Sequence, residues 1–227
     1  MLRKRKCIAI LAILALLLAA LIDPAWAGRG NGNNNGGNGG GGNDDGDRAS
    51  AELTEAEIAG LVFMREEEKL ARDVYLNLYD AWGLTVFQNI AGSEQKHTDA
   101  IENLLENYGI ADPVVDEEGR GVYDDPDLQL LYVDLIEYGL ASATYALVVG
   151  ATIEEKDIFD IQAKIDSAAQ ADIVSTYESL MCGSRNHLRA FMNNLDAVGE
   201  PYAAQFLSQE EFDEIVDGSL ETDCGDY

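Results

Sequence analysis

The chain has 227 residues, of which 42 are Asp or Glu and 15 are Lys or Arg, so its formal net charge at pH 7 is −27. This charge argues against nucleic acids and anionic membrane surfaces as partners, because both repel a strongly acidic protein. About 180 residues remain once two atypical N-terminal segments are set aside, which is enough for one domain.

Residues 1–27 have the pattern of a secretory signal peptide. The basic run RKRK at 3–6 precedes an apolar stretch at 8–22, and AWA at 25–27 is a small-x-small cleavage site. The apolar stretch is short for a bilayer span of about 20 residues, although an uncleaved signal anchor is the alternative. Cleavage would remove four basic residues and one acidic residue and leave a net charge of −30. We expect a secreted or periplasmic protein that is not embedded in a membrane after cleavage.

Residues 28–50 are dominated by Gly, Asn and Asp. This composition cannot bury a core and predicts a disordered linker. The acidic cluster at residues 44–47 lacks the spacing of an EF-hand loop, so we assign it to the linker. We expect a folded helical domain at residues 51–200, followed by a C-terminal helix and an acidic tail at 201–227.

Two long helices are predicted first, because apolar residues recur every three or four positions after residue 54. Thr54 and Glu57 have the spacing of a capping box, and Gly83 ends the first helix. Thr85 is the expected cap of the second helix, which ends at Gly109. The short link between them predicts antiparallel neighbours.

A crossover of about thirty residues follows, with a short helix predicted at 127–138. The third long helix is expected to begin near Ser142 and the fourth near Asp172, and Ser208 with Glu211 predicts a last short helix. The long connection lies between the second and third long helices. The sequence therefore predicts an all-α protein, a ferritin-like four-helix bundle with a long crossover and short accessory helices.

Polar residues interrupt the apolar stripe of all four long helices. They are Glu68 in the first, Glu94 and His97 in the second, Glu154 in the third, and Ser184 and His187 in the fourth. Unpaired buried polar groups are costly, and Glu94 and His97, three residues apart, share one helix face. One carboxylate from each of two helices, with Glu-x-x-His from the other two, forms the di-metal sites of bundle cores. The pattern therefore predicts a metal site.

Several segments resemble known families. EKLARDVY at 68–75 and Glu94-x-x-His97 are similar to motifs of rubrerythrin-like members of the ferritin-like superfamily. GLVFMREEEKLARDVY, SEQKH, VGATIEEKDI and YESLMCGSRNHLRAF resemble DUF2202, an uncharacterised family of bacterial and archaeal ferritin-like proteins. The resemblance spans roughly residues 52–197. It implies the fold and a metal site, but the family has no settled activity to carry over.

The resemblance also implies a role for each candidate ligand. Glu68 would be the first-helix ligand, Glu94 a bridging carboxylate, and His97 its terminal imidazole. His187 would be the second imidazole. Glu154 would be the third-helix ligand, with Glu155 as the alternative, because the stripe could rotate by one residue.

The chain departs from this pattern at Ser184, where the second Glu-x-x-His should begin. Glu178 is nine residues before His187, too far along the helix axis to replace the missing carboxylate. Glu155 or Asp157 could replace it from the third helix. Otherwise the second metal is weak or absent, and the site is mononuclear or asymmetric.

Three further features have less specific interpretations. We expect Glu66 and Glu67 to lie at the surface or to be satisfied locally, beside the ligand Glu68. Tyr75, one or two turns from the presumed ligands, could donate a hydrogen bond to one of them. The two cysteines that remain after processing, Cys182 and Cys224, either form a disulfide that ties the tail to a helix or remain separate.

The predicted function is iron-dependent redox chemistry with oxygen or peroxide, as in ferroxidase-like or peroxidase-like members of the superfamily. Manganese could replace iron, and zinc is possible. One alternative is a non-catalytic module that binds divalent metal ions, and another is an interaction scaffold with a degenerate site. A homodimer is a possible assembly. Rubredoxin-type Cys-x-x-Cys motifs are absent from the sequence, so electrons would come from another molecule or from ferrous iron.

Overall fold

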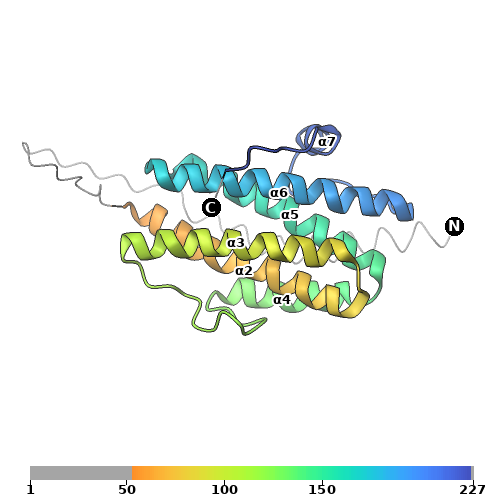
Figure 1. The fold of residues 1–227 in the computed structure, drawn as a ribbon, viewed down its shortest axis with the longest axis horizontal. Helices are drawn as coiled ribbons and strands as arrows, with labels where there is room; N and C mark the ends of the chain where they lie inside the picture. Colours follow the sequence, from red (N-terminus) through yellow and green to blue (C-terminus); the bar gives the residue numbers. More distant parts are fainter. Residues whose placement is uncertain (1–52, 226–227) are drawn as a thin grey trace, which may run out of the picture. The chain divides into compact units, whose positions relative to one another are not determined.

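The computed structural model describes residues 53–225. The predicted signal peptide and the Gly/Asn-rich linker lie outside these residues. Within the described part all regular secondary structure is helical, which confirms the all-α prediction. The six helices are α2 (Glu55–Trp82), α3 (Thr85–Tyr108), α4 (Pro126–Gly139), α5 (Ala143–Ser167), α6 (Ala171–Val198) and α7 (Gln209–Asp217) (Figure 1).

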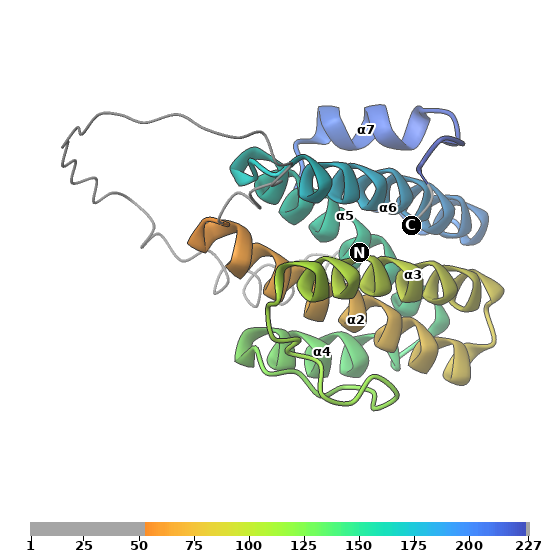
Figure 2. The ribbon, with the colours of Figure 1, turned by 60° about the vertical axis from the view of Figure 1, so that its left-hand side comes forward.

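The four long helices form a closed ring of neighbours. α2 packs against α3 and α5, and α6 packs against α5 and α3. The shorter helices lie outside this ring, with α4 against α2 and α5 and α7 against α6 (Figure 2). Apolar side chains from all four long helices fill the core. Among residues 53–225, no helix combines the length and hydropathy that crossing a bilayer requires.

The helix ends follow from local sequence. Thr54 and Glu57 form the predicted capping box of α2, and Ser142 caps α5 by accepting a hydrogen bond from the amide of Tyr145. Gly83 and Gly109 end α2 and α3 at φ of 66° and 67°, a left-handed conformation that glycine adopts without steric cost. The predicted Thr85 cap is wrong, because Leu84 occupies the cap position and makes no side-chain bond.

The segment between α3 and α4 is held on α2 by buried charges. Arg65 donates to Asp112 and Glu117, and Lys69 donates to the carbonyl oxygen of Gly119 at 2.7 Å. Asp73 accepts from the amide of Gly121 at 3.0 Å and from Lys69 at 2.7 Å. Because this segment covers the outer face of α2, residues 64–75 are buried on every side of the helix.

The expectation for Glu66 and Glu67 is therefore wrong. Both are buried, at 3% and 4% exposure, and both have partners far along the chain. Glu66 accepts from the backbone amides of Asp124 and Asp125, and Glu67 pairs with Lys156 at 2.5 Å. These partners come from segments that the local pattern around residue 66 does not describe.

The C-terminal segment is fastened to α6. Cys182 and Cys224 form a disulfide, so the bonded alternative is the one that the structure contains. Glu221 pairs with Arg185 at 2.5 Å and with Arg189 at 3.0 Å. The tail therefore lies along the same helix that carries His187.

Candidate metal centre

Five of the six predicted ligands meet inside the ring of long helices. They are Glu68 of α2, Glu94 and His97 of α3, Glu154 of α5 and His187 of α6. The three glutamates are each 1% exposed, His97 is fully buried, and His187 is 9% exposed. Each helix thus brings its polar stripe residue to the same level of the core.

Glu94 is the centre of the cluster. Its Oε2 lies 2.8 Å from Nδ1 of His97, and its Oε1 lies 2.8 Å from Nδ1 of His187. The two imidazoles stack on each other with ring centroids 5.5 Å apart. Glu68 approaches His97 at 3.3 Å and Glu154 approaches His187 at 3.4 Å. The carboxylate of Glu94 therefore connects two halves of the site.

These distances define two groups of potential ligands that share Glu94. The α3 group consists of Glu68, Glu94 and His97, and the α6 group of Glu94, Glu154 and His187. Within each group the ligand atoms lie within 4.8 Å of one another. Carboxylate and imidazole suit divalent iron, manganese and zinc. The geometry is therefore compatible with one metal ion in each group.

Several buried atoms of the cluster have no hydrogen-bond partner. They are Oε1 of Glu68, Oε1 of Glu94 and Nδ1 of His187. The last two lie 2.8 Å apart, yet without the alignment of a hydrogen bond. A buried polar atom without a partner costs about 1–3 kcal/mol. Cations bound in the two groups would give these atoms a partner.

Burial and mutual repulsion control the protonation of the carboxyl groups. Burial raises the pKa of Glu68, and the attraction of His97 offsets only part of this. The pKa of Glu154 is also raised, by burial and by the neighbouring charge of Glu94. Glu94 behaves in the opposite way, because His187 and His97 outweigh its burial and hold its pKa well below the usual range.

The histidines respond in a complementary way. Burial lowers the pKa of His187, but the carboxylates of Glu94 and Glu154 outweigh this and raise it to about 9. Burial likewise opposes protonation of His97, and Glu94 and Glu68 raise its pKa well above the usual range. Without a metal, protons on the imidazoles therefore balance part of the negative charge of the cluster.

Tyr75 and two phenylalanines border the α6 group. The phenol of Tyr75 donates to Oε1 of Glu154 at 2.5 Å, which makes the predicted contact between Tyr75 and a ligand. The ring of Tyr75 packs against Phe87 and Phe191, with centroids 6.0 Å and 5.3 Å away. These rings hold the Tyr75 side chain in place, and its phenol fixes the orientation of the Glu154 carboxylate.

The structure does not bring Glu155 to the cluster, so this alternative to Glu154 needs correction. Its Oε1 accepts from the backbone amides of Gln205, Phe206 and Leu207 at 2.6–2.9 Å. Its Oε2 accepts from the phenol of Tyr202 at 2.7 Å. Glu155 therefore anchors the segment before α7, on a face of α5 that is rotated away from the face of Glu154.

Asp157, a possible substitute for the missing carboxylate, is a buried acid of α5. Asp157 is 5% exposed and accepts a hydrogen bond from Ser184 at 2.5 Å. Its spacing of three residues from Glu154 places both on one face of α5. That spacing was readable in the sequence, but the contact across to Ser184 was not.

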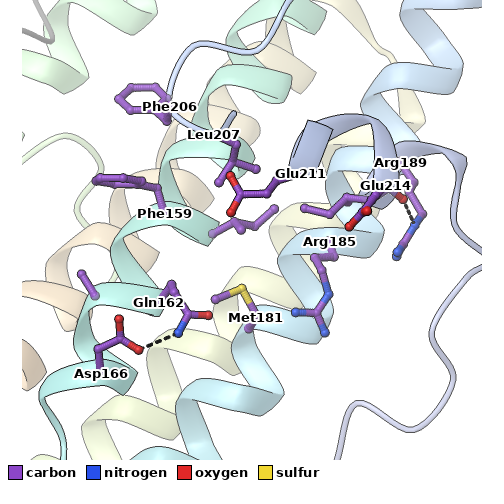
Figure 3. A pocket seen from close by; sticks show the side chains of 13 residues that line it. Phe159, Gln162, Asp166, Met181, Arg185, Arg189, Phe206, Leu207, Glu211 and Glu214 are labelled. Atoms are coloured by element: carbon purple, nitrogen blue, oxygen red, sulfur yellow. Dashed lines mark hydrogen bonds between the residues drawn. The ribbon is translucent and has the colours of Figure 1, made fainter. Parts of the chain in front are cut away.

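A groove of about 590 Å³ opens elsewhere on the surface, between α5, α6 and α7 (Figure 3). Phe159, Met181 and Phe206 contribute to its apolar walls, and Arg185 and Glu214 lie among its polar residues. No predicted ligand lines this groove. The candidate metal centre is thus a buried cluster that is separate from it.

Comparisons with known proteins give relatives of similar sequence and fold. The model of an "Uncharacterized protein domain (DUF2202)" matches residues 57–219. The chain is 50% identical over 169 residues to the "Uncharacterized protein MJ0754" of Methanocaldococcus jannaschii, a match that covers 74% of this chain and 91% of the relative. The crystal structure of hypothetical protein MJ0754 aligns with a TM-score of 0.74 and 48% identity, covering 78% of this chain and 100% of that one.

Proposed function

Because the chain belongs to the DUF2202 family, whose description states no activity, we propose its function from the geometry of the buried cluster. The protein is an exported, ferritin-like metal-binding protein. It holds divalent iron between its histidines and glutamates and carries out redox chemistry with oxygen or peroxide.

The convergence of the α3 and α6 groups on Glu94 is the observation that carries this proposal. Three buried carboxylates without a single Lys or Arg among their contacts are expensive to maintain in a core. Oε1 of Glu94 and Nδ1 of His187 lie 2.8 Å apart without the alignment of a hydrogen bond, and Oε1 of Glu68 has no hydrogen-bond partner, which supports cations at these atoms. A bound metal ion would neutralise the buried carboxylates and would also give these polar atoms a partner.

The ligand types favour iron or manganese, and of these two we propose iron. Mixed carboxylate and imidazole sets of this kind, projected inward from four helices, hold di-iron and di-manganese centres. The cluster contains no thiolate, the ligand type that selects copper(I) and iron–sulfur clusters. Bound iron would supply electrons to a small oxidant. The protein contributes the ligands, the phenol of Tyr75 that orients Glu154, and the rings of Phe87 and Phe191 that pack around Tyr75.

The disulfide between Cys182 and Cys224 supports export. Disulfides form and persist in oxidising compartments such as the periplasm and the extracellular space. A basic and apolar N-terminal segment ending in a small-x-small site agrees with this. Fractionation of cells that express the full chain tests the proposal, because a cytoplasmic, unprocessed protein would contradict it.

The metal proposal is tested with the chain from residue 28 onward, stripped of metal and equilibrated with Fe²⁺ without oxygen. We expect stoichiometric iron, followed by rapid oxidation when oxygen or peroxide is added. Glu94→Gln should abolish stoichiometric binding, whereas Glu178→Gln, on the exposed surface of α6, should not. Tight zinc with no iron oxidation would reduce the function to metal binding. No stoichiometric metal of any kind would reject the proposal.

A further inference from the structure

Position 184 is where a ligand carboxylate is missing from α6. Ser184 is fully buried, and its hydroxyl donates to Oδ2 of Asp157 at 2.5 Å. Asp157 comes from α5, which packs directly against α6. A carboxylate is therefore present beside position 184, although it arrives from the opposite helix.

The second oxygen of Asp157 is unaccounted for. Oδ1 is buried and has no hydrogen-bond partner. The nearest basic residue along the helix, Lys156, is engaged by Glu67 and Asp160. Asp157 thus has one oxygen held by Ser184 and one oxygen that faces the core without a partner.

The carboxyl groups of the candidate metal centre act on Asp157 electrostatically, although its oxygens lie outside the two groups whose ligand atoms are within 4.8 Å of one another. The carboxyl groups that act on it most strongly are those of Glu68, Glu67, Glu154 and Glu94, and together with burial they hold its pKa well above the usual range. Three of these four are ligands of the α3 and α6 groups. An additional acid placed among like charges needs a cation to be stable in its ionised form.

We propose that Asp157 is a metal ligand of this centre and supplies from α5 the carboxylate that Ser184 fails to supply from α6. Ser184 is a positioning residue, which holds Asp157 by one oxygen and leaves the other for the metal. This inference rests on the proposed function, since it concerns the same site. Its consequence is that the ions of the α3 and α6 groups are both held tightly, instead of one of them weakly.

The formal charge of the buried carboxylates matches that of two divalent metal ions. Glu68, Glu94, Glu154 and Asp157 are four buried carboxylates, whose formal negative charge equals the positive charge of two divalent cations with neutral imidazoles. Without Asp157, the side chains of the cluster would leave one positive charge of two divalent ions unbalanced. The short side chains of Asp157 and Ser184 also fit the close packing of α5 on α6, where Gly150 meets Phe191.

The test counts Mn²⁺ ions bound by the chain from residue 28 onward, by equilibrium dialysis and by electron paramagnetic resonance. The wild type should bind two ions that are magnetically coupled. Asp157→Asn keeps the shape of the side chain and should retain one uncoupled ion. The affinity for the second should fall by more than the about 10–100-fold that loss of an outer-sphere partner costs. Asp166→Asn, on the exposed face of α5, should change neither number nor coupling.

A variant that moves the carboxylate from position 157 of α5 to position 184 of α6 gives a second, independent test. Asp157→Ala combined with Ser184→Glu should regain the second ion that Asp157→Ala alone loses. If Asp157→Asn binds two coupled ions with unchanged affinity, the inference is overturned but the proposed function is not. A wild type that binds a single ion has the same two consequences. A wild type without stoichiometric metal would overturn both. Circular dichroism confirms that each variant is folded before its ions are counted.

Discussion

Glu94 is contacted by two histidines, and if the cluster binds metal as proposed, this arrangement makes protons and metal ions competitors for the same atoms. In the metal-free protein, protons on His97 and His187 neutralise part of the charge of the surrounding glutamates. Metal ligands must be deprotonated, so binding releases these protons. The same residues therefore make both the stability of the metal-free protein and its metal affinity depend on pH.

The metal-free protein should lose stability between pH 6.5 and about 9. The pKa of His187 rises from 6.5 to about 9 on folding, so its contribution is full below pH 6.5 and disappears as the pH rises through about 9. The pKa of Glu68 is also raised on folding, so its contribution to stability is likewise lost as the pH rises, beginning at a lower pH than that of His187. The low pKa of Glu94 stabilises the fold above its ordinary value of 4.5, so Glu94 adds no slope in this window.

Urea unfolding of metal-free and metal-loaded protein at a series of pH values measures this effect. The loaded protein should be nearly independent of pH in this range, since its ligands carry no protons to lose. Metal-free stability that stays constant or rises toward pH 9 would contradict the assignment of charged histidines.

At the level of helices, α5 shows what the sequence could and could not establish. Helix boundaries, caps and the all-α class follow from local patterns, and they were predicted within a few residues. The sequence alone cannot decide whether Glu154 or Glu155 is the candidate ligand of this helix. Residues 151–158 are all buried, so no exposed polar face shows which side of the helix points outward. Partners distant in sequence, such as the amides of residues 205–207, decide which carboxylate faces the metal centre.

The approach of α5 to α6 depends on Gly150. A Cβ atom at this position would lie 2.3 Å from the ring of Phe191, one turn after His187 on α6. Gly150→Ala gains about 0.5–1 kcal/mol of helix propensity, but overpacking a tight core costs about 1–3 kcal/mol. We expect net destabilisation, with weaker metal binding in the α6 group because the two helices move apart.

Gly92→Ala is the matched control for Gly150→Ala. Gly92 lies on the exposed face of α3, and a Cβ atom there would meet nothing within 4 Å. This variant should gain about 0.5–1 kcal/mol, the opposite sign. Equal stabilisation of both variants in denaturant unfolding would show that α5 and α6 are not tightly packed at this level.

At the scale of the whole molecule, residues 201–225 belong to the fold more than their acidic composition suggested. Glu155 binds the segment before α7, and the disulfide with the Glu221 ion pairs binds the segment after it. The sequence predicts only a C-terminal helix and an acidic tail here, because the partners that fix this segment lie on α5 and α6. None of the predicted metal ligands lies in this segment.

Cys224→Ser should therefore lower stability without changing metal content. The disulfide joins residues 42 apart in sequence, and removing such a bond costs about 2–4 kcal/mol, largely by freeing the unfolded chain. Calorimetry should show a lower Tm for the variant, and a reductant should lower the wild type to the same value without affecting the variant. An unchanged Tm, or a loss of bound metal, would show that the tail has a different role.

The central claim is that Glu94 and its neighbours hold metal ions. Crystals of the chain from residue 28 onward, loaded with Fe²⁺ and measured on both sides of the iron absorption edge, test it most directly. We predict anomalous peaks within bonding distance of Glu94, one beside His97 and one beside His187. Peaks only at the protein surface, with water or hydrogen bonds filling the space between the two imidazoles, would contradict it.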